Sequence, residues 1–205
     1  YIGLTSVGIG VTFGALWGIL AAYFGGAFDL LSQRLVDSVM AFPGIVLAIS
    51  LMAVLGQSVD NVVIALAFLL MPISARIMRS STLAIIANVY VEAARAIGGS
   101  HMQIVWRHIL PNSMAPYIVL VSVNLAYAIV VEASLSFLGL GAPPDEPSWG
   151  GMLTEAADTL LSAPWMSLFP GMAITLAVFG MNMLGDAMRD VLDPKLRGQQ
   201  GQDKN

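Results

Sequence analysis

The sequence predicts an all-α membrane protein, a polytopic helical bundle that crosses the bilayer about five times. Its 205 residues are 57% hydrophobic and only 11% charged, and the mean hydropathy of +0.79 exceeds what a soluble domain tolerates. A hydrocarbon core of ~30 Å needs ~20 apolar residues per helix. Five segments approach this length: residues 2–24, 39–57, 61–79, 114–138 and 167–188. The alternating pattern of barrel strands is missing, so we expect one helical domain over residues 1–205.

The first predicted span carries small residues at every fourth position. Gly10, Gly14 and Gly18 repeat at this spacing, and Ala22 and Gly26 continue it. Residues four apart lie on one face of a helix, and a face without bulky side chains lets another helix approach closely. We therefore expect helix packing at Gly10, Gly14 and Gly18, with a pore-lining surface as the alternative.

A polar, charged hairpin is predicted between the third and fourth spans, in residues 80–112. Its centre, Glu92 to Pro111, reads EAARAIGGSHMQIVWRHILP. The first half is a short Ala-rich helix, and Gly98 and Gly99 then permit backbone angles that a continuous helix does not supply. Apolar residues at i, i+3, i+4 and i+7 predict an amphipathic second helix. The apolar stripe consists of Met102, Val105, Trp106 and Ile109.

The basic residues predict the orientation. All nine lie on the side of the bilayer that carries the hairpin: Arg34, Arg76, Arg79, Arg95, Arg107, Arg189, Lys195, Arg197 and Lys204. The opposite side, about 58–60 and 139–166, has acidic but no basic residues. Because cytoplasmic segments are enriched in Lys and Arg, we expect the hairpin and the tail 189–205 to be cytoplasmic and the loop 139–166 external. An external start without methionine predicts one further helix upstream.

Enzyme and metal signatures are absent from the sequence. There is no G-x-x-x-x-G-K-[ST] motif for ATP phosphates, and the only lysines are Lys195 and Lys204. There is also no G-x-S-x-G and no H-E-x-x-H. His101 and His108 are seven residues apart, too far to hold one metal ion together. We expect no catalytic site, metal site or bound cofactor, and the lack of a basic patch predicts no nucleic-acid partner.

The hairpin resembles the EAA loop of bacterial ABC importer permeases, in which Glu-Ala-Ala is followed by Gly and later by Ile-x-Leu-Pro. The matching residues are Glu92, Ala93, Ala94, Gly98, Leu110 and Pro111. His108 replaces the usual Ile, although RHILPN is similar to the form seen in the dipeptide and oligopeptide branch. The resemblance implies an ATPase-coupling loop with these residues and with Arg95, Gly99 and Ser100.

A second segment makes the resemblance more specific. SFLGLG, followed by a Pro-rich turn and PSWG, is similar to the C-type permease subunit of dipeptide, oligopeptide and nickel importers. AAYFGGAFDLLSQRLVDSVMAFPGIVLA and LGDAMRDVLDPKLRG agree in order, so the resemblance covers nearly the whole chain. It implies a type I ABC importer transmembrane domain that lacks its N-terminal helix.

The same resemblance implies partners, location and solute. The partners are a homologous second permease subunit, two cytoplasmic ATPase subunits that use ATP and Mg, an external solute-binding protein and membrane lipid. The location is the plasma (inner) membrane of a bacterium or archaeon. Di- or oligopeptides are the expected solute, with nickel or another small solute as the alternative. An ATP-independent channel or secondary carrier is the competing function class, and an intramembrane hydrolase ranks last.

Glu132 lies six residues before the predicted end of the fourth span, roughly 9 Å below the external boundary. A carboxylate at that depth is costly unless it faces protein or water. It either lines the translocation path near an outer gate or forms a hydrogen bond to a neighbouring helix end. Both interpretations stand on the sequence alone.

Overall fold

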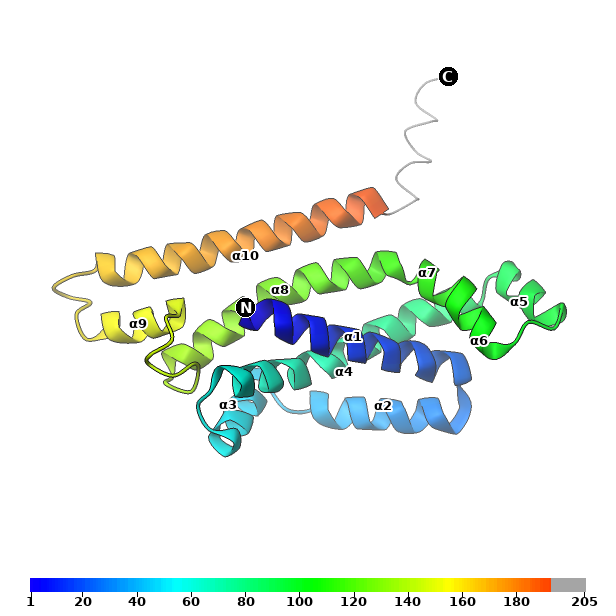
Figure 1. Ribbon diagram of the computed structural model, residues 1–205, viewed down its shortest axis with the longest axis horizontal. Helices are drawn as coiled ribbons and strands as arrows, with labels where there is room; N and C mark the ends of the chain where they lie inside the picture. The colour runs from blue at the N-terminus through cyan, green and yellow to red at the C-terminus, as the bar shows by residue number, and fades with distance from the viewer. Residues whose placement is uncertain (193–205) are drawn as a thin grey trace, which may run out of the picture.

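Four long helices form the body of the molecule (Figure 1). The computed structural model describes residues 1–192, and within this range all regular structure is helical. The long helices are α1 (Ile2–Phe24), α4 (Val59–Ile86), α8 (Met114–Phe137) and α10 (Trp165–Leu192). Each is long and apolar enough to cross a membrane. The predicted fold class, an all-α polytopic membrane protein, is confirmed.

The predicted span at residues 39–57 is not one straight helix. The chain forms α2 (Gly26–Met40) and α3 (Gly44–Leu55), and these two helices are bent by 84° at a short break. Pro43 lies in the break, and proline disfavours helical geometry at the residue before it. With 12 residues, α3 is only about 18 Å long. The described residues therefore hold four complete spans, or five if α2 and α3 form one broken span.

The glycine face of α1 packs directly on α4. A Cβ atom added to Gly10, Gly14 or Gly18 would come within 3.0 Å of the α4 backbone, at the carbonyl groups of Ala67, Met71 and Ala75 respectively. Gly26 does not continue this face, because α1 ends at Phe24 and the chain turns there. The two helices are thus in backbone contact along about two turns of helix.

Polar side chains tie two other helices to this pair. Arg79 on α4 donates from Nε and Nη2 to the two carboxylate oxygens of Asp29 on α2, each at 2.6 Å. Arg76 forms a second ion pair with Asp37. On the other side, the hydroxyls of Thr12 on α1 and Tyr117 on α8 are hydrogen-bonded at 2.8 Å. These contacts fix α2 and α8 against the α1 and α4 pair.

The bundle has two distinct ends (Figure 1). The hairpin end carries α5 (Val89–Ala96), α6 (His101–Ile104), a π-helical turn (Val105–Ile109) and α7 (Leu110–Asn112). The loop end carries α9 (Trp149–Ala157) and the segments that flank it. α1 runs from the loop end to the hairpin end, and α4 and α8 connect the hairpin to the bundle. The name hairpin is used below for residues 89–112.

Candidate functional site

The turn of the hairpin is built by three consecutive small residues. α5 ends at Ala96, and Gly98 follows with φ of +82°. The Gly98 and Gly99 N–H groups donate to the carbonyls of Arg95 and Ala94, both at 3.0 Å, and so close the end of α5. The Ser100 hydroxyl then accepts a hydrogen bond from the Gln103 N–H and begins α6. A left-handed φ favours glycine, so the sequence GGS determines this sharp reversal.

The hairpin has a buried inner face and an exposed outer face. Val91, Ile104 and Ile109 are buried in the core that α1, α4 and α8 share. Most of the residues implied in coupling lie outside this core. Glu92, Ala93, Arg95, Gly98, Ser100 and Pro111 are exposed, whereas Ala94, Gly99 and Leu110 are partly buried. A hairpin held from inside thus presents its charged and glycine-rich residues outward.

The predicted amphipathic stripe of the second hairpin helix is wrong in its register. Val105 and Ile109 are buried as expected, but Met102 and Trp106 are 67% and 61% exposed. The cause is the π-helical turn from Val105 to Ile109, whose wider spacing turns a different set of residues inward. Pro111 has no N–H to donate, and its ring crowds the preceding turn of an α-helix, which favours such a wider turn.

The register shift leaves large apolar side chains on the outer face. Met102, Trp106 and Ile97, which is 87% exposed, accompany the charged residues of the hairpin. Apolar groups that project beyond the ends of the spans gain stability when a partner covers them. The outer face of the hairpin therefore has the composition of a protein-binding surface.

The two histidines of the hairpin each lie against an aromatic ring. His101 Nδ1 is hydrogen-bonded to the hydroxyl of Tyr23 on α1 at 2.9 Å, and His108 packs near the ring of Tyr90. Within residues 1–192, no three His, Asp or Glu side chains gather as a potential metal site. Both histidines instead contact aromatic rings.

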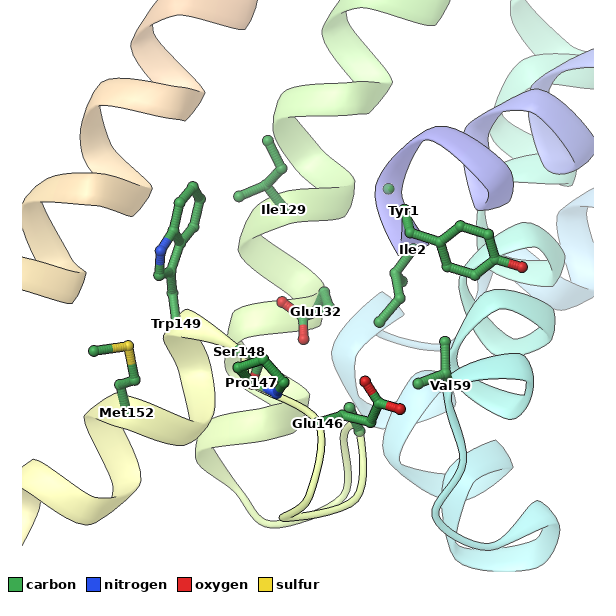
Figure 2. Close-up of a pocket in the computed structure, with 12 residues that line it drawn as sticks. Tyr1, Ile2, Val59, Ile129, Glu132, Glu146, Pro147, Ser148, Trp149 and Met152 are labelled. Atoms are coloured by element: carbon green, nitrogen blue, oxygen red, sulfur yellow. The ribbon is translucent and has the colours of Figure 1, made fainter.

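At the loop end, Glu132 faces a cavity of about 410 Å³ between α8, the start of α1 and the loop before α9 (Figure 2). Ile2, Ile129, Glu146 and Ser148 are among the other residues that line it. The carboxylate of Glu132 is partly buried. Its Oε1 accepts a hydrogen bond from the hydroxyl of Ser136, one turn later in the same helix, at 2.8 Å. Within the described residues it has no hydrogen bond to a neighbouring helix end.

α9, which lines the cavity with Trp149 and Met152, lies beside contacts at the loop end that were not predicted from the sequence. The Thr154 hydroxyl on α9 is 3.0 Å from the Phe137 carbonyl at the end of α8. A Cβ atom on Gly150 would lie within 3.0 Å of Ala133 of α8. The amide of Gln57 donates to the Gly139 carbonyl. The small residues of the Pro/Gly-rich segment were the available signal, because close approach of two backbones requires them. α9 is therefore docked on α8.

A comparison with known protein families matches residues 14–198 to the family described as "Binding-protein-dependent transport system inner membrane component". A putative peptide transport system permease protein of Brucella suis biovar 1 (strain 1330) is 46% identical, over 96% of this chain and 66% of that protein. A glutathione transport system permease protein of Pectobacterium atrosepticum is 44% identical, over 95% and 65%. The chain thus spans just under two thirds of the length of these relatives.

Two solved structures share the fold. The MetNI methionine ABC transporter, in inward facing conformations, aligns with a TM-score of 0.72 at 18% identity, covering 94% of this chain and 93% of the other. An amino acid ABC transporter with histidines aligns with a TM-score of 0.60 at 20% identity, covering 95% and 90%. At such identities the likeness shows the fold alone. The family match over residues 14–198 shows that the chain belongs to the inner-membrane components of binding-protein-dependent transport systems.

Proposed function

We propose that this chain is the permease subunit of an ATP-driven importer and forms half of the membrane pathway for di- or oligopeptides. The observation that carries the proposal is the hairpin. Its inner face is buried among the spans, and its outer face exposes Ile97, Met102 and Trp106 beside Glu92 and Arg95. The relatives that are named peptide and glutathione permeases support a small peptide as the solute.

The proposed partners rest on the family match over residues 14–198 and on the missing P-loop. The sequence of this chain has no P-loop, so we propose that two separate ATPase subunits bind ATP and Mg, and that this chain binds no cofactor and catalyses no reaction. We propose that the ATPase subunits bind residues 92–100 and that this is the coupling contact. A homologous permease subunit supplies the other half of the pathway, and a solute-binding protein delivers the solute at the loop end.

The proposed mechanism uses the connections of the hairpin. When ATP closes the two ATPase subunits, their movement displaces the hairpin. α4 enters the hairpin and α8 leaves it, so both helices are displaced with it. α8 carries Glu132 and the docked α9 at its far end. A displacement at one side of the membrane thereby opens or closes the cavity at the other.

The orientation is tested with single cysteines, since the chain has none of its own. Asp145 at the loop end and Gln103 on the hairpin are both exposed. We expect Asp145→Cys to react with a membrane-impermeant thiol reagent in intact cells. Gln103→Cys should react only after the membrane is opened, because the basic residues predict a cytoplasmic hairpin. The reverse labelling pattern would contradict both the orientation and the docking of cytoplasmic ATPase subunits.

We propose that Glu132 lines the translocation path and meets the amino group of the peptide. Its environment supports this, because its carboxylate faces the cavity and Ser136 is its hydrogen-bond partner.

A hydrogen bond between the Glu132 carboxylate and the amino group of the peptide would contribute about 1.5 to 3 kcal/mol. We therefore expect Glu132→Gln to slow uptake of a free peptide about tenfold at saturating binding protein, with little effect on its N-acetylated form. Glu146→Gln, an exposed change on the same cavity, is the control. If wild type and Glu132→Gln take up the free peptide at the same rate, Glu132 does not contact the peptide in the translocation path.

An ATP-independent channel or secondary carrier is the alternative, and it differs in one requirement. It would move peptide across a bilayer that contains this protein without ATPase subunits. We expect proteoliposomes with the permease subunits alone to show no uptake, and those with the complete importer to take up peptide only when ATP is present. Uptake without ATPase subunits would replace the importer proposal.

A further inference from the structure

We propose that α1 is a second mechanical connection between the hairpin and the loop-end cavity, and that Tyr23 and His101 join α1 to the hairpin. α4 and α8 are continuous with the hairpin along the chain, but α1 is not. α1 can follow a movement of the hairpin through its packing on α4 and, at the hairpin itself, only through side-chain contacts. This inference rests on the proposed function of the hairpin as the coupling element.

Both helices of the hairpin meet on the ring of Tyr23. The Tyr23 hydroxyl is 2.9 Å from Nδ1 of His101, the first residue of α6. The two rings lie edge to face, with centroids 5.7 Å apart. From α5, the guanidinium carbon of Arg95 lies 5.6 Å from the centre of the Tyr23 ring, within the range of a cation–π contact. One aromatic side chain of α1 therefore contacts α5 and α6 together.

The contact lies at the edge of the shared core. Tyr23 is only 8% exposed, and it belongs to the same buried cluster as Ile19 of α1, Met78 of α4, Val91 of α5 and Ile104 of α6. His101 is exposed, so the hydrogen bond lies between a buried tyrosine and the surface of the hairpin, and the two ring contacts of Tyr23 accompany it. The hairpin and the end of α1 are consequently held in one relative position.

The geometry of α1 suits the transmission of a displacement. Its 23 residues contain no proline and form a rod of about 34 Å. At the far end, Ile2 and Gly3 line the same cavity as Glu132, as Figure 2 shows for Ile2. Just beyond Tyr23, Gly25 and Gly26 have φ of +63° and +57°, so the rigid rod ends at the hairpin. A displacement of α1 at Tyr23 therefore also displaces Ile2 and Gly3 at the cavity wall.

The glycine face of α1 couples the movement of α1 to that of α4. Gly10, Gly14 and Gly18 leave no gap to the α4 backbone, so α1 and α4 move as a unit along most of their length. The Tyr23 contact adds a connection at the hairpin end, where α4 passes into α5. Loss of this contact would leave the ATPase-binding face of the hairpin intact but would loosen the connection to the cavity.

The test compares peptide uptake per ATP hydrolysed by the complete importer in proteoliposomes. Tyr23→Phe removes only the hydroxyl, and His101→Ala removes its partner. We expect each change to lower uptake per ATP by about five-fold, which corresponds to about 1 kcal/mol, while ATPase co-purification stays at the wild-type level. The variant with both changes should show the same uptake per ATP as each single variant, because the two single variants and the double variant lack the same hydrogen bond. Tyr127→Phe is the control, since Tyr127 lies on α8 outside the hairpin and its hydroxyl has no hydrogen bond within residues 1–192.

A distance measurement distinguishes a loss of transmission between the hairpin and the cavity from a general effect of the substitutions on folding. Spin labels on Leu4→Cys of α1 and Asp145→Cys, both exposed, report the distance across the cavity mouth with and without ATP. We expect the ATP-dependent change in this distance to shrink in Tyr23→Phe and His101→Ala but to persist in Tyr127→Phe. Unchanged uptake per ATP, an unchanged distance response, or additive losses in the double variant would each overturn the inference. Loss of ATPase association in every importer, wild type included, would instead refute the proposed function.

Discussion

Gly98→Val is expected to leave the protein inserted in the membrane and to abolish most of the ATP-driven uptake. Gly98 has φ of +82°, where a β-branched side chain is strained by about 1 to 3 kcal/mol. Apart from its two chain neighbours, no group lies within 4 Å of the position that its Cβ would take, so the Cβ atom meets open space and the strain comes from the backbone. The backbone relieves the strain by changing φ, which moves Ile97 and Ser100 away from their places on the outer face.

Gly56→Val is a closely matched control for this variant. Gly56 also has φ of +82° and also has no neighbour within 4 Å of its Cβ position, but it lies at the opposite end of the bundle. Gly56 has ψ of 169°, a backbone region that only glycine adopts readily, so Gly56→Val carries at least as much local strain as Gly98→Val. A loss of uptake that is larger in Gly98→Val therefore reports on the hairpin. The measurements are ATPase co-purification and peptide uptake at matched abundance. Normal uptake with full ATPase association in Gly98→Val would show that the hairpin is not the coupling element.

The long helices illustrate what a hydrophobicity pattern reveals. The first span was predicted at residues 2–24, and α1 occupies Ile2–Phe24. The third was predicted to end at Arg79, yet α4 continues to Ile86. Arg76 and Arg79 lie near the predicted end of this span, and both pair with carboxylates of α2. Partners that are distant in sequence cannot be identified from the apolar pattern of one segment.

Two differences between the predicted and the observed helices occur beside prolines. The break between α2 and α3 contains Pro43, and the π-helical turn precedes Pro111. A prediction that assumes one helical period places Met102 and Trp106 inside, whereas the wider turn places them outside. This error matters for function, because it changes which apolar side chains are available to a partner. The presence of a proline predicts that a helix is disturbed, but not how.

The candidate site was visible only in part. The sequence of the hairpin indicated its turn, because two glycines and a serine have strong local preferences. By contrast, Tyr23 and His101 are 78 positions apart, and neither has a special local signature. Glu132 stood out because a carboxylate within an apolar span is rare. Its partner Ser136 and the cavity that it faces depend on how α1, α8 and the loop before α9 meet.

Gly14→Leu is expected to prevent the correct assembly of the bundle. A side chain at this position meets the carbonyl of Met71 and the Cβ of Ser74 within 3.0 Å. The carbonyl is part of a helix backbone and cannot rotate away, so α1 and α4 must separate. Overpacking by movable side chains costs about 1 to 3 kcal/mol, and a backbone obstacle should exceed this range. Because the glycine face continues at Gly10 and Gly18, separation at Gly14 also opens their contacts.

Gly8→Leu is the control on the same helix. Gly8 is exposed, and nothing lies within 4 Å of its Cβ position, so the same added side chain points away from the protein. Both variants gain apolar surface and should insert into the membrane equally well. We expect thermal unfolding in detergent, followed by protease resistance, to show a strongly destabilised Gly14→Leu and a Gly8→Leu close to wild type. If Gly14→Leu is as stable as Gly8→Leu, α1 does not lie on α4 in the membrane, and α1 cannot transmit a movement of the hairpin together with α4.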